Sequence, residues 1–322
     1  MYADNREDLL IRVASLYYEY DYSQQEIAER LQISRSNISR LLKEAKQKGL
    51  VEIRIHKRIM TVPALEHEFH ERFELEHAMI VDGGDITYRE QLAAAGQLAA
   101  WYLEETLRPN HVMAISWGTG VAAAVNAMSA NPLLQIDVVQ MIGSVGTVDS
   151  VIDGPELARQ LAGKLGGQYY YLHAPLFVDN QTVRDMFLEQ PTISETLRRA
   201  HAAQVALVGI GTTEPGASSF LRAGHLSEDE ITQLRQQGAV GETSGKHFDI
   251  EGNANFDLNH RVIAVSLADL KKIPCVVAVA CGLPKSRSIV GALRGGYIKA
   301  LATDSITAVA VLQEADRITT QS

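Results

Sequence analysis

The sequence predicts an α/β protein with two parts: a winged helix-turn-helix head at the N-terminus and a larger domain built on a parallel sheet. Two apolar stripes at helical spacing, separated by a short break, lie within residues 22–48. From residue 76 onward, short runs that are apolar throughout alternate with helical patterns, which is typical of a parallel sheet covered on both faces. We therefore expect a head at residues 1–58, a linker at 59–75 and a larger α/β domain at 76–322.

The head begins with an apolar stripe in residues 6–20, which predicts its first helix. Ser23 stands at the N-cap position of the second helix, and Glu26 follows at the spacing of a capping box. Ser34 is expected to cap the third helix after a tight turn. The turn lacks the usual glycine, so Gln32 must adopt a positive φ at some cost or form a different turn. These signals together predict a helix-turn-helix.

The outward face of the third helix is polar and basic, and it carries no acidic residue before Glu44. Such a face suits the major groove, because Arg can bond guanine, Asn can bond adenine, and Ser and Lys can reach phosphates. The alternative is an ordinary helical hairpin with a solvated basic face. The small Ala28 at the helix crossing and the two serine caps favour DNA binding. The residues expected to contact double-stranded operator DNA are Ser23, Gln24, Ser34, Arg35, Ser36, Asn37, Ser39, Arg40 and Lys43.

A basic segment follows the third helix. Residues 50–56 alternate between apolar and polar side chains, which predicts a half-buried strand, the wing. Arg54, Lys57 and Arg58 could then reach phosphates. Residues 34–58 hold eight Lys or Arg against two Glu, a net charge of +6, whereas the whole chain carries −9 and the remainder therefore −15. A basic head on an acidic body is the charge pattern expected when only the head binds DNA.

The linker, residues 61–75, is predicted to be a helix, because Leu65, Phe69 and Phe73 recur at helical spacing. We expect this helix to contact its copy in a dimer. Two histidines on it lack a third ligand nearby, so no metal site is expected.

The larger domain is expected to alternate strands and helices. Its strands are expected at residues 76–83, 111–116, 136–143, 168–175, 204–213, 262–266, 275–282 and 297–303. Its helices are expected at 89–107, 121–129, 155–165, 183–188, 192–203, 228–237, 285–293 and 305–315, and residues 239–253 have mixed strand character. The two cysteines, Cys275 and Cys281, fall on one strand about 20 Å apart and cannot pair. With no apolar run long enough to span a membrane and no signal peptide, a cytoplasmic protein without membrane contact is expected.

Gly, Ser and Thr follow four of the predicted strands, at residues 116–120, 143–147, 209–213 and 281–286. Ligands of parallel sheets bind at the carboxyl ends of strands, and backbone N–H groups at a helix start favour phosphate. Simple turn glycines would explain one such loop but not four. The first loop also matches the dinucleotide fingerprint, yet the next strand does not end in an acidic residue and no Walker lysine follows. A sugar phosphate therefore fits better than NAD or ATP, and no cofactor is expected.

Two further positions could hold the hydroxyl groups of a sugar. Asp249 lies between Phe248 and Ile250, and Lys285 precedes a helix. From the residues alone, a surface acid in a turn and a surface lysine at a helix start remain the simpler interpretation.

Nearly the whole chain resembles one family, the SorC/DeoR-type sugar-binding transcriptional regulators. The resemblance is carried by LYYEYDYSQQEIAERLQISRSNISRLLKEAKQKGLVEIRI in the head and by VMAISWGTG, AVGETSGKHFDIEGN and VAVACGLPKSRSIVGALRGGYIKALATD in the body. It implies a body like the sugar-phosphate isomerase/deaminase superfold, used for sensing, with a phosphorylated sugar as effector. It also implies a homo-oligomer, a dimer or tetramer, that controls a carbohydrate or nucleoside catabolic operon.

The resemblance puts the effector phosphate at Gly118, Thr119 and Gly120 and sugar contacts at Asp249 and Lys285. With the next strand-end loop, the expected effector-binding residues are Gly118, Thr119, Gly120, Gly143, Ser144, Asp249 and Lys285. The chain departs from the family pattern just before Lys285, where Cys281-Gly282-Leu283-Pro284 stands in place of two glycines and a polar residue.

An enzyme is the competing hypothesis: a sugar-phosphate isomerase with an attached DNA-binding head. Such an enzyme needs a base near neutral pKa. Asp249, Glu242 and Glu214 are candidates, but the sequence shows no Asp/His cluster. A ligand-responsive regulator without catalytic activity is therefore favoured. An architectural DNA binder is disfavoured by the acidic, loop-rich body.

Overall fold

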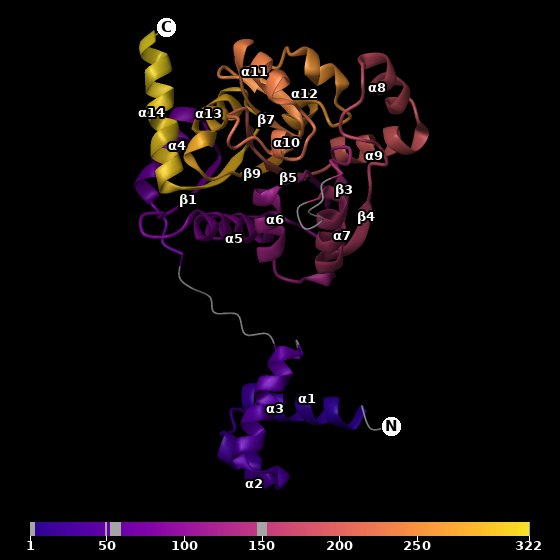
Figure 1. The fold of residues 1–322 in the computed structure, drawn as a ribbon, viewed down its shortest axis with the longest axis vertical. Helices are drawn as coiled ribbons and strands as arrows, with labels where there is room; N and C mark the ends of the chain where they lie inside the picture. The colour runs from indigo at the N-terminus through magenta and orange to yellow at the C-terminus, as the bar shows by residue number, and fades with distance from the viewer. Residues whose placement is uncertain (1–3, 49, 52–58, 147–152, 322) are drawn as a thin grey trace. The chain divides into compact units, whose positions relative to one another are not determined.

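The structure is a computed structural model that describes residues 4–48, 50–51, 59–146 and 153–321. The chain divides into two units, Met1–Arg58 and Ile59–Ser322, which we call the head and the body. Figure 1 shows the two units as ribbons. Each unit has its own hydrophobic core.

The head contains three helices, α1 (Asp4–Tyr18), α2 (Gln24–Leu31) and α3 (Arg35–Gln47). Their inward faces form a small core of fully or nearly fully buried side chains: Leu10, Val13, Ala14, Ile27, Ala28, Ile38, Leu41, Leu42 and Ala45. The predicted helix-turn-helix is confirmed. Most of the predicted wing, including Arg54, Lys57 and Arg58, lies outside the described residues.

The body is built on a seven-stranded parallel sheet, as predicted. In spatial order its strands are β1 (His77–Val81), β10 (Ala300–Asp304), β9 (Cys275–Val279), β5 (Val205–Gly209), β2 (Val112–Ile115), β3 (Ile136–Gln140) and β4 (Gly166–Tyr170). Successive side chains enter the cores on opposite faces; in β9, Val277 and Val279 enter one core and Val276 and Ala278 the other. Both faces of the central strands are therefore buried, which explains why these strands are largely apolar, whereas the edge strand β4 is partly exposed.

Helices cover both faces of the sheet (Figure 1). One face is covered by α5 (Tyr88–Thr106), α6 (Thr119–Ala127) and α7 (Gly154–Leu165). The other is covered by α4 (Pro63–Phe73), α9 (Pro191–His201), α13 (Ser286–Arg294) and α14 (Ser305–Gln321). Shorter helices are α8 (Gln181–Leu188), α10 (Ser219–Arg222), α11 (Glu228–Gln236) and α12 (Leu267–Leu270), and 3₁₀ turns span Pro132–Leu134, Asp257–Arg261 and Leu283–Lys285.

The segment with mixed strand character belongs to a second, antiparallel sheet. This sheet contains β6 (Gly211–Thr212), β7 (Ala239–Thr243) and β8 (Lys246–Asp249). Ser244 and Gly245 form the tight turn between β7 and β8, and both have positive φ, as hairpin turns of this length require.

The predicted linker helix corresponds to α4, and the structure places it in the body unit. Phe69 is fully buried, and Leu65 and Phe73 pack against the same core. The apolar stripe of this helix thus packs against the core of the body. A dimer contact through α4 stays a prediction, and it would have to use the other face of the helix.

The strand expected at residues 262–266 is wrong. This segment makes only isolated antiparallel bridges, between Val262 and Phe177 and between Ala264 and Ile142. It runs between the extended segments that follow β3 and β4, with the N–H of Ile263 donating to the carbonyl of Leu176. A short buried apolar run does not by itself distinguish a strand of the main sheet from another buried extended segment.

Candidate functional site

The turn between α2 and α3 takes the more costly of the two expected forms. Gln32 has φ 53° and ψ 40°, in the left-handed region. Its N–H bonds back to Glu29, and the N–H of Ile33 donates to the carbonyl of Ala28 at 3.0 Å. These two bonds close α2 in a Schellman-type cap. The turn therefore keeps its geometry without glycine, at a conformational cost.

The caps of both helices are formed as the spacing predicts. The Ser23 hydroxyl accepts from the Glu26 N–H, and the Glu26 carboxylate accepts from the Ser23 N–H at 2.8 Å. The Ser34 hydroxyl accepts from the Asn37 N–H at 3.4 Å. Both serine side chains are therefore engaged in holding the helix starts.

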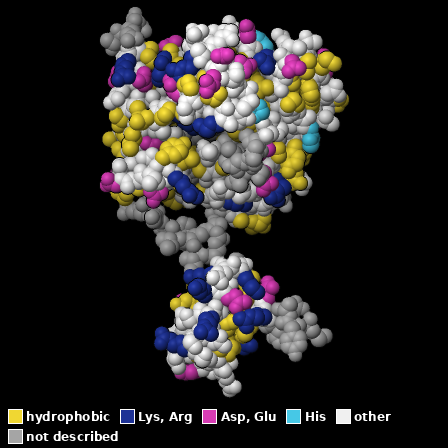
Figure 2. All heavy atoms as spheres, in the orientation of Figure 1, with side chains coloured by type: hydrophobic (Ala, Val, Ile, Leu, Met, Phe, Trp, Pro, Cys, Tyr) yellow, Lys and Arg dark blue, Asp and Glu magenta, His cyan; other side chains and the backbone are white. Residues whose placement is uncertain are grey.

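The outward face of α3 is free to meet a partner. Ser34, Arg35, Ser36, Asn37, Ser39, Arg40 and Lys43 are all exposed, as is Ser23, and Gln24 is half-buried. None of the three cations in this set forms an ion pair with another described residue. Figure 2 shows Lys and Arg side chains spread over the visible face of the head. The arrangement has the basic, unpaired face that a major-groove helix requires.

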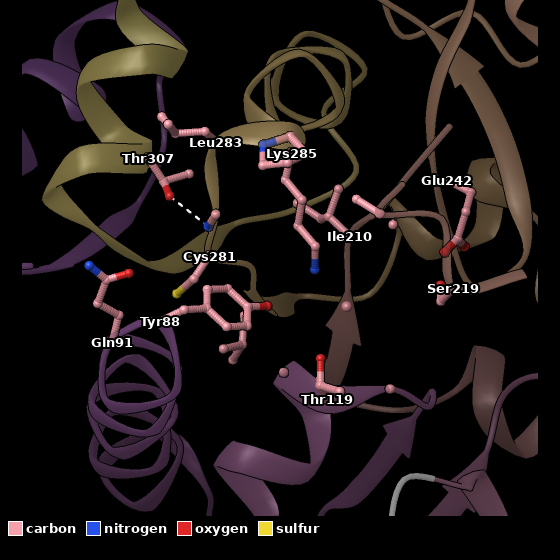
Figure 3. A pocket seen from close by; sticks show the side chains of 18 of the residues that line it. Tyr88, Gln91, Thr119, Ile210, Ser219, Glu242, Cys281, Leu283, Lys285 and Thr307 are labelled. Carbon is pink, nitrogen blue, oxygen red and sulfur yellow. Dashed lines mark hydrogen bonds between the residues drawn. The ribbon is translucent and has the colours of Figure 1, made fainter. Parts of the chain in front are cut away.

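The body contains a cavity of about 660 Å³ at the carboxyl edge of the parallel sheet (Figure 3). Its floor is formed where β2, β5, β9 and β10 end, at Ser116, Gly209, Val279 and Asp304. The chain leaves β2 for β3 and β4 and then returns to place β5 on the other side of β2. Ligands of open α/β sheets bind at such a reversal of strand order.

The start of α6 lines one side of this cavity. Gly118 has φ 110° and ψ 171°, a conformation essentially restricted to glycine. A side chain at Gly120 would lie 2.3 Å from the carbonyl oxygen of Val279, so this glycine lets α6 pack directly on β9. No side chain caps the first turn of α6. The N–H groups of this turn are therefore available to an anion.

Lys285 points its ammonium group into the middle of the cavity, on the side of Thr119 (Figure 3). Arg222, at the end of α10, lines the same cavity. Neither cation forms an ion pair with another described residue, and burial lowers the pKa of Lys285. Two cations beside an uncapped helix start favour an anionic ligand.

Glu242, on β7, is one of two acidic residues in the cavity lining, the other being Asp304. The Oε2 atom of Glu242 accepts a hydrogen bond from the Gly245 N–H at 3.0 Å. Burial raises the pKa of this carboxyl group to about 7, although the Gly245 N–H and the charge of Lys285 act in the opposite direction. Near neutral pH the group can therefore either donate or accept a hydrogen bond. Ser219 lies beside it, and the Tyr88 hydroxyl points towards the centre of the cavity (Figure 3).

Four of the seven effector-binding residues expected from sequence meet in this cavity: Gly118, Thr119, Gly120 and Lys285. Asp249 does not line it. Its Oδ1 accepts from the N–H groups of Glu251 and Asn253, and its Oδ2 accepts from the Asn253 amide. The carboxylate is thus used to hold its own turn, as the simpler interpretation of that residue had it.

Gly143 and Ser144 also lie outside the cavity. A side chain at Gly143 would lie 2.3 Å from the carbonyl oxygen of Pro175. Ser144 forms an isolated parallel bridge with Pro175. Gly143 and Ser144 thus hold the segment after β3 against the segment after β4. We therefore leave Gly143, Ser144 and Asp249 out of the site.

Sequence reasoning missed Tyr88, Ser219 and Arg222 and named Glu242 only as a base for the enzyme alternative. Tyr88 opens α5, and Arg222 lies on a helix of four residues. No spacing in the sequence links these positions to the strand ends. Glu214, another candidate base, is ion-paired with Arg235 at 2.6 Å and lies outside this cavity.

Two families match the two units. Residues 57–313 match the family described as "Putative sugar-binding domain", and residues 19–58 match the MarR family. The first match covers most of the chain and includes every residue of the cavity.

Relatives match along almost the whole length. The chain is 33% identical to the deoxyribonucleoside regulator of Bacillus subtilis over 310 residues, which cover 96% of this chain and 98% of the relative. It is 29% identical to the sorbitol operon regulator of Klebsiella pneumoniae, covering 96% and 100%. Both relatives are regulators of transcription, which agrees with the expectation of a regulator over an enzyme.

Solved structures of transcriptional regulators also match the chain. The full-length sorbitol operon regulator SorC from Klebsiella pneumoniae superposes with a TM-score of 0.72 at 28% identity, covering 96% of this chain and 99% of that one. A sugar-binding domain of a transcriptional repressor from Vibrio fischeri gives 0.71 at 32% identity, covering 79% and 100%. In the part of the chain that the structure describes, no helix has the length and apolarity needed to cross a bilayer.

Proposed function

The chain belongs to the SorC-type family of sugar-binding transcriptional regulators, and we propose that its effector is a phosphorylated sugar bound in the cavity of the body. The carrying observation is that Lys285 and the uncapped start of α6 line the same cavity. Helix starts and unpaired cations both stabilise a phosphate group. Gly118, Thr119, Gly120, Lys285 and Arg222 are the residues we assign to it.

The sugar itself would lie beside the phosphate, with its hydroxyl groups towards Glu242 and Ser219. A carboxyl group whose pKa lies near 7 can accept from one hydroxyl or donate to another. The names of the relatives, which refer to deoxyribonucleosides and sorbitol, support an effector from carbohydrate or nucleoside catabolism.

For the head, we propose that α3 enters the major groove of an operator. Arg35, Asn37 and Arg40 would read bases, and the serines and Lys43 would hold phosphates. Ser23 and Gln24 would contact the backbone beside the start of α2. Operators read in this way are commonly two half-sites, so we propose that the protein acts as a homo-oligomer, a dimer or a tetramer.

The effector controls DNA binding only if it binds two states of the protein with different affinities. The ligand must therefore contact elements that can shift relative to one another. The cavity meets this condition, because its lining comes from α5, α6, α10, β7 and the turn before α13.

Isothermal titration calorimetry with a panel of sugar monophosphates and their unphosphorylated sugars tests the proposal. We expect at least one phosphorylated sugar to bind and its unphosphorylated counterpart to bind far more weakly. Lys285→Met should abolish binding. Lys272→Met is the matched control, because Lys272 is exposed and paired with Asp269 away from the cavity. Equal binding by the Lys285 variant, or binding of the free sugar alone, would remove the phosphate from the proposal.

A further inference from the structure

A second, smaller hollow of about 90 Å³ lies in the body, apart from the larger cavity that holds Lys285. It is formed where β6 and α11 end and where β7 and α13 begin. Both of these helices pack against β7 (Figure 1). The side chains of Thr212, Thr213, Glu214, Arg235 and Arg287 supply its polar groups, and its other lining residues have no polar side chain.

The hydroxyl groups of the hollow already have partners. Thr212 Oγ1 donates to the Pro284 carbonyl at 2.8 Å and accepts from the Glu214 N–H at 3.2 Å. Thr213 Oγ1 donates to the Ala239 carbonyl at 2.9 Å. A ligand in the hollow would therefore take its hydrogen bonds from the two arginines.

Arg235 places its guanidinium group at the hollow. It donates to the Thr213 carbonyl at 3.3 Å and pairs with the Glu214 carboxylate at 2.6 Å, and both of these residues line the hollow. Arg235 lies in the last turn of α11, where the helix dipole favours a cation. The side chains of Arg235 and Glu214 are 35% and 43% exposed. Solvent therefore weakens the pair, and an anion of higher charge can compete with Glu214.

Arg287 lacks this support. It is exposed, and it forms no ion pair with another residue in the part of the chain that the structure describes. It lies in the first turn of α13, at the positive end of the helix dipole, where a cation is disfavoured. Lys285, just before the same helix, lines the larger cavity, whereas Arg287 lines the hollow. The start of α13 thus presents one cation to each of two separate spaces.

We propose that Arg235 and Arg287 form a second anion site in the body, and that it takes a single phosphate group. Guanidinium groups bind phosphate through paired, charge-assisted hydrogen bonds. Two positive side chains line the hollow against one negative side chain, so its net charge is +1. A phosphate group carries a charge of about −1.5 to −2 at pH 7, so it can displace the singly charged carboxylate of Glu214.

The size of the hollow limits what it can hold. It measures about 90 Å³, against about 660 Å³ for the larger cavity, and pockets that enclose a whole metabolite are several times larger. The ligand is therefore free phosphate, or the terminal phosphate group of a molecule that remains outside. This site is independent of the sugar phosphate assigned to the larger cavity.

Phosphate binding to the full chain with Lys285→Met tests the proposal, because that variant lacks the central cation of the larger cavity. Calorimetry at pH 8, with chloride used to match the ionic strength, should show binding of orthophosphate. Adding Arg287→Gln should weaken this binding about tenfold or more, because it removes charge-assisted hydrogen bonds. Arg198→Gln is the matched control, because Arg198 is 68% exposed and lines neither space. It should leave phosphate binding unchanged.

Glu214→Gln tests the competition between the carboxylate and the ligand. This variant removes the charge that phosphate must displace from Arg235. In the Lys285→Met background it should strengthen phosphate binding by up to about fivefold. Weaker binding would mean that Glu214 supports the site, which contradicts the proposed displacement.

Methyl phosphate and acetate identify the source of the ligand. Equal binding of methyl phosphate and orthophosphate would indicate the terminal phosphate of a larger molecule, and binding of orthophosphate alone would indicate the free ion. Acetate, with a single charge, should bind more weakly than either phosphate compound that binds. Tighter binding of acetate would overturn the assignment to phosphate.

Two further results would overturn the proposal and leave the sugar-phosphate assignment untouched. One is that neither phosphate compound binds to the Lys285→Met variant. The other is that Arg287→Gln leaves phosphate binding unchanged. If Arg287→Gln then also changed the mass of the assembly in light scattering, Arg287 would belong to a contact between copies of the chain.

Discussion

Replacing Glu242 by Gln should stabilise the body at alkaline pH while weakening its response to the effector. The amide has nearly the same shape as the carboxyl group and can still accept the hydrogen bond from the Gly245 N–H. It cannot ionise. The substitution therefore isolates the cost of holding a carboxylate in a buried position.

The magnitude follows from the pKa of the buried group. In the folded chain this pKa is raised from the ordinary value of 4.5 to about 7. Below pH 4.5 the carboxyl group is protonated in both states and has no effect on stability. Between these two values the unfolded state releases the proton and the folded state keeps it, so stability falls as the pH rises. Above pH 7 the full penalty, about 3 kcal/mol, is present.

Thermal unfolding followed by tryptophan fluorescence measures this effect in the body, because Trp101 and Trp117 both lie there. The variant should match the unchanged protein near pH 4.5 and unfold at a temperature roughly 5–10 °C higher at pH 8. Glu214→Gln is the control, since Glu214 is ion-paired with Arg235 and partly exposed; it should show no such gain. The measured quantity is the difference in unfolding temperature between the Glu242→Gln variant and the unchanged protein. If this difference were no larger at pH 8 than at pH 4.5, the reasoning would be refuted.

Four further substitutions address the head and the linker helix. Gln32→Gly should stabilise the α2–α3 turn by roughly 0.5–1 kcal/mol, because glycine adopts positive φ without strain; slower amide hydrogen exchange in α2 and α3 would show it, and faster exchange would contradict it. Arg35→Ala should weaken operator binding by roughly 1–3 kcal/mol and relax specificity at one base pair. Lys43→Ala should instead weaken binding to all DNA sequences and reduce the slope of log affinity against log salt concentration by about 1. If competition and salt titrations showed identical effects for the two variants, the assigned roles would be wrong. Phe69→Ala should cost the body about 3–5 kcal/mol, because its ring is fully buried; urea unfolding measures this, and a loss below 1 kcal/mol would mean that α4 is not part of the body core.

Local signals in the sequence were sufficient for the three helices of the head. Ser23 and Glu26 lie three residues apart, so a capping box could be predicted from spacing alone and is formed in the structure. The same holds for the central strands of the main sheet, whose apolar runs reflect burial on both faces. The exception, residues 262–266, has the same composition as those strands, and only its tertiary neighbours after β3 and β4 decide where it pairs.

The ligand cavity could be predicted only in part. Gly118, Thr119 and Gly120 follow a strand directly and stand out as a strand-end loop. Arg222 and Tyr88 reach the cavity through the packing of α10 and α5, which no spacing encodes. Asp249 lies outside the cavity for a physical reason: an acidic residue in a turn can serve a ligand or the turn, and here the N–H groups of Glu251 and Asn253 donate to its Oδ1.

Fluorescence anisotropy of labelled operator DNA, with and without the sugar monophosphate that binds most tightly, tests the central claim most directly. The unchanged protein should alter its operator affinity at least about fivefold when the ligand is present. Lys285→Met should bind the operator equally well without ligand and should not respond to it. If operator affinity stayed constant at saturating ligand, or if the Lys285→Met variant showed the full ligand-dependent change in affinity, the central claim would be contradicted. That claim is that the body binds a phosphorylated sugar and thereby changes the affinity of the head for DNA.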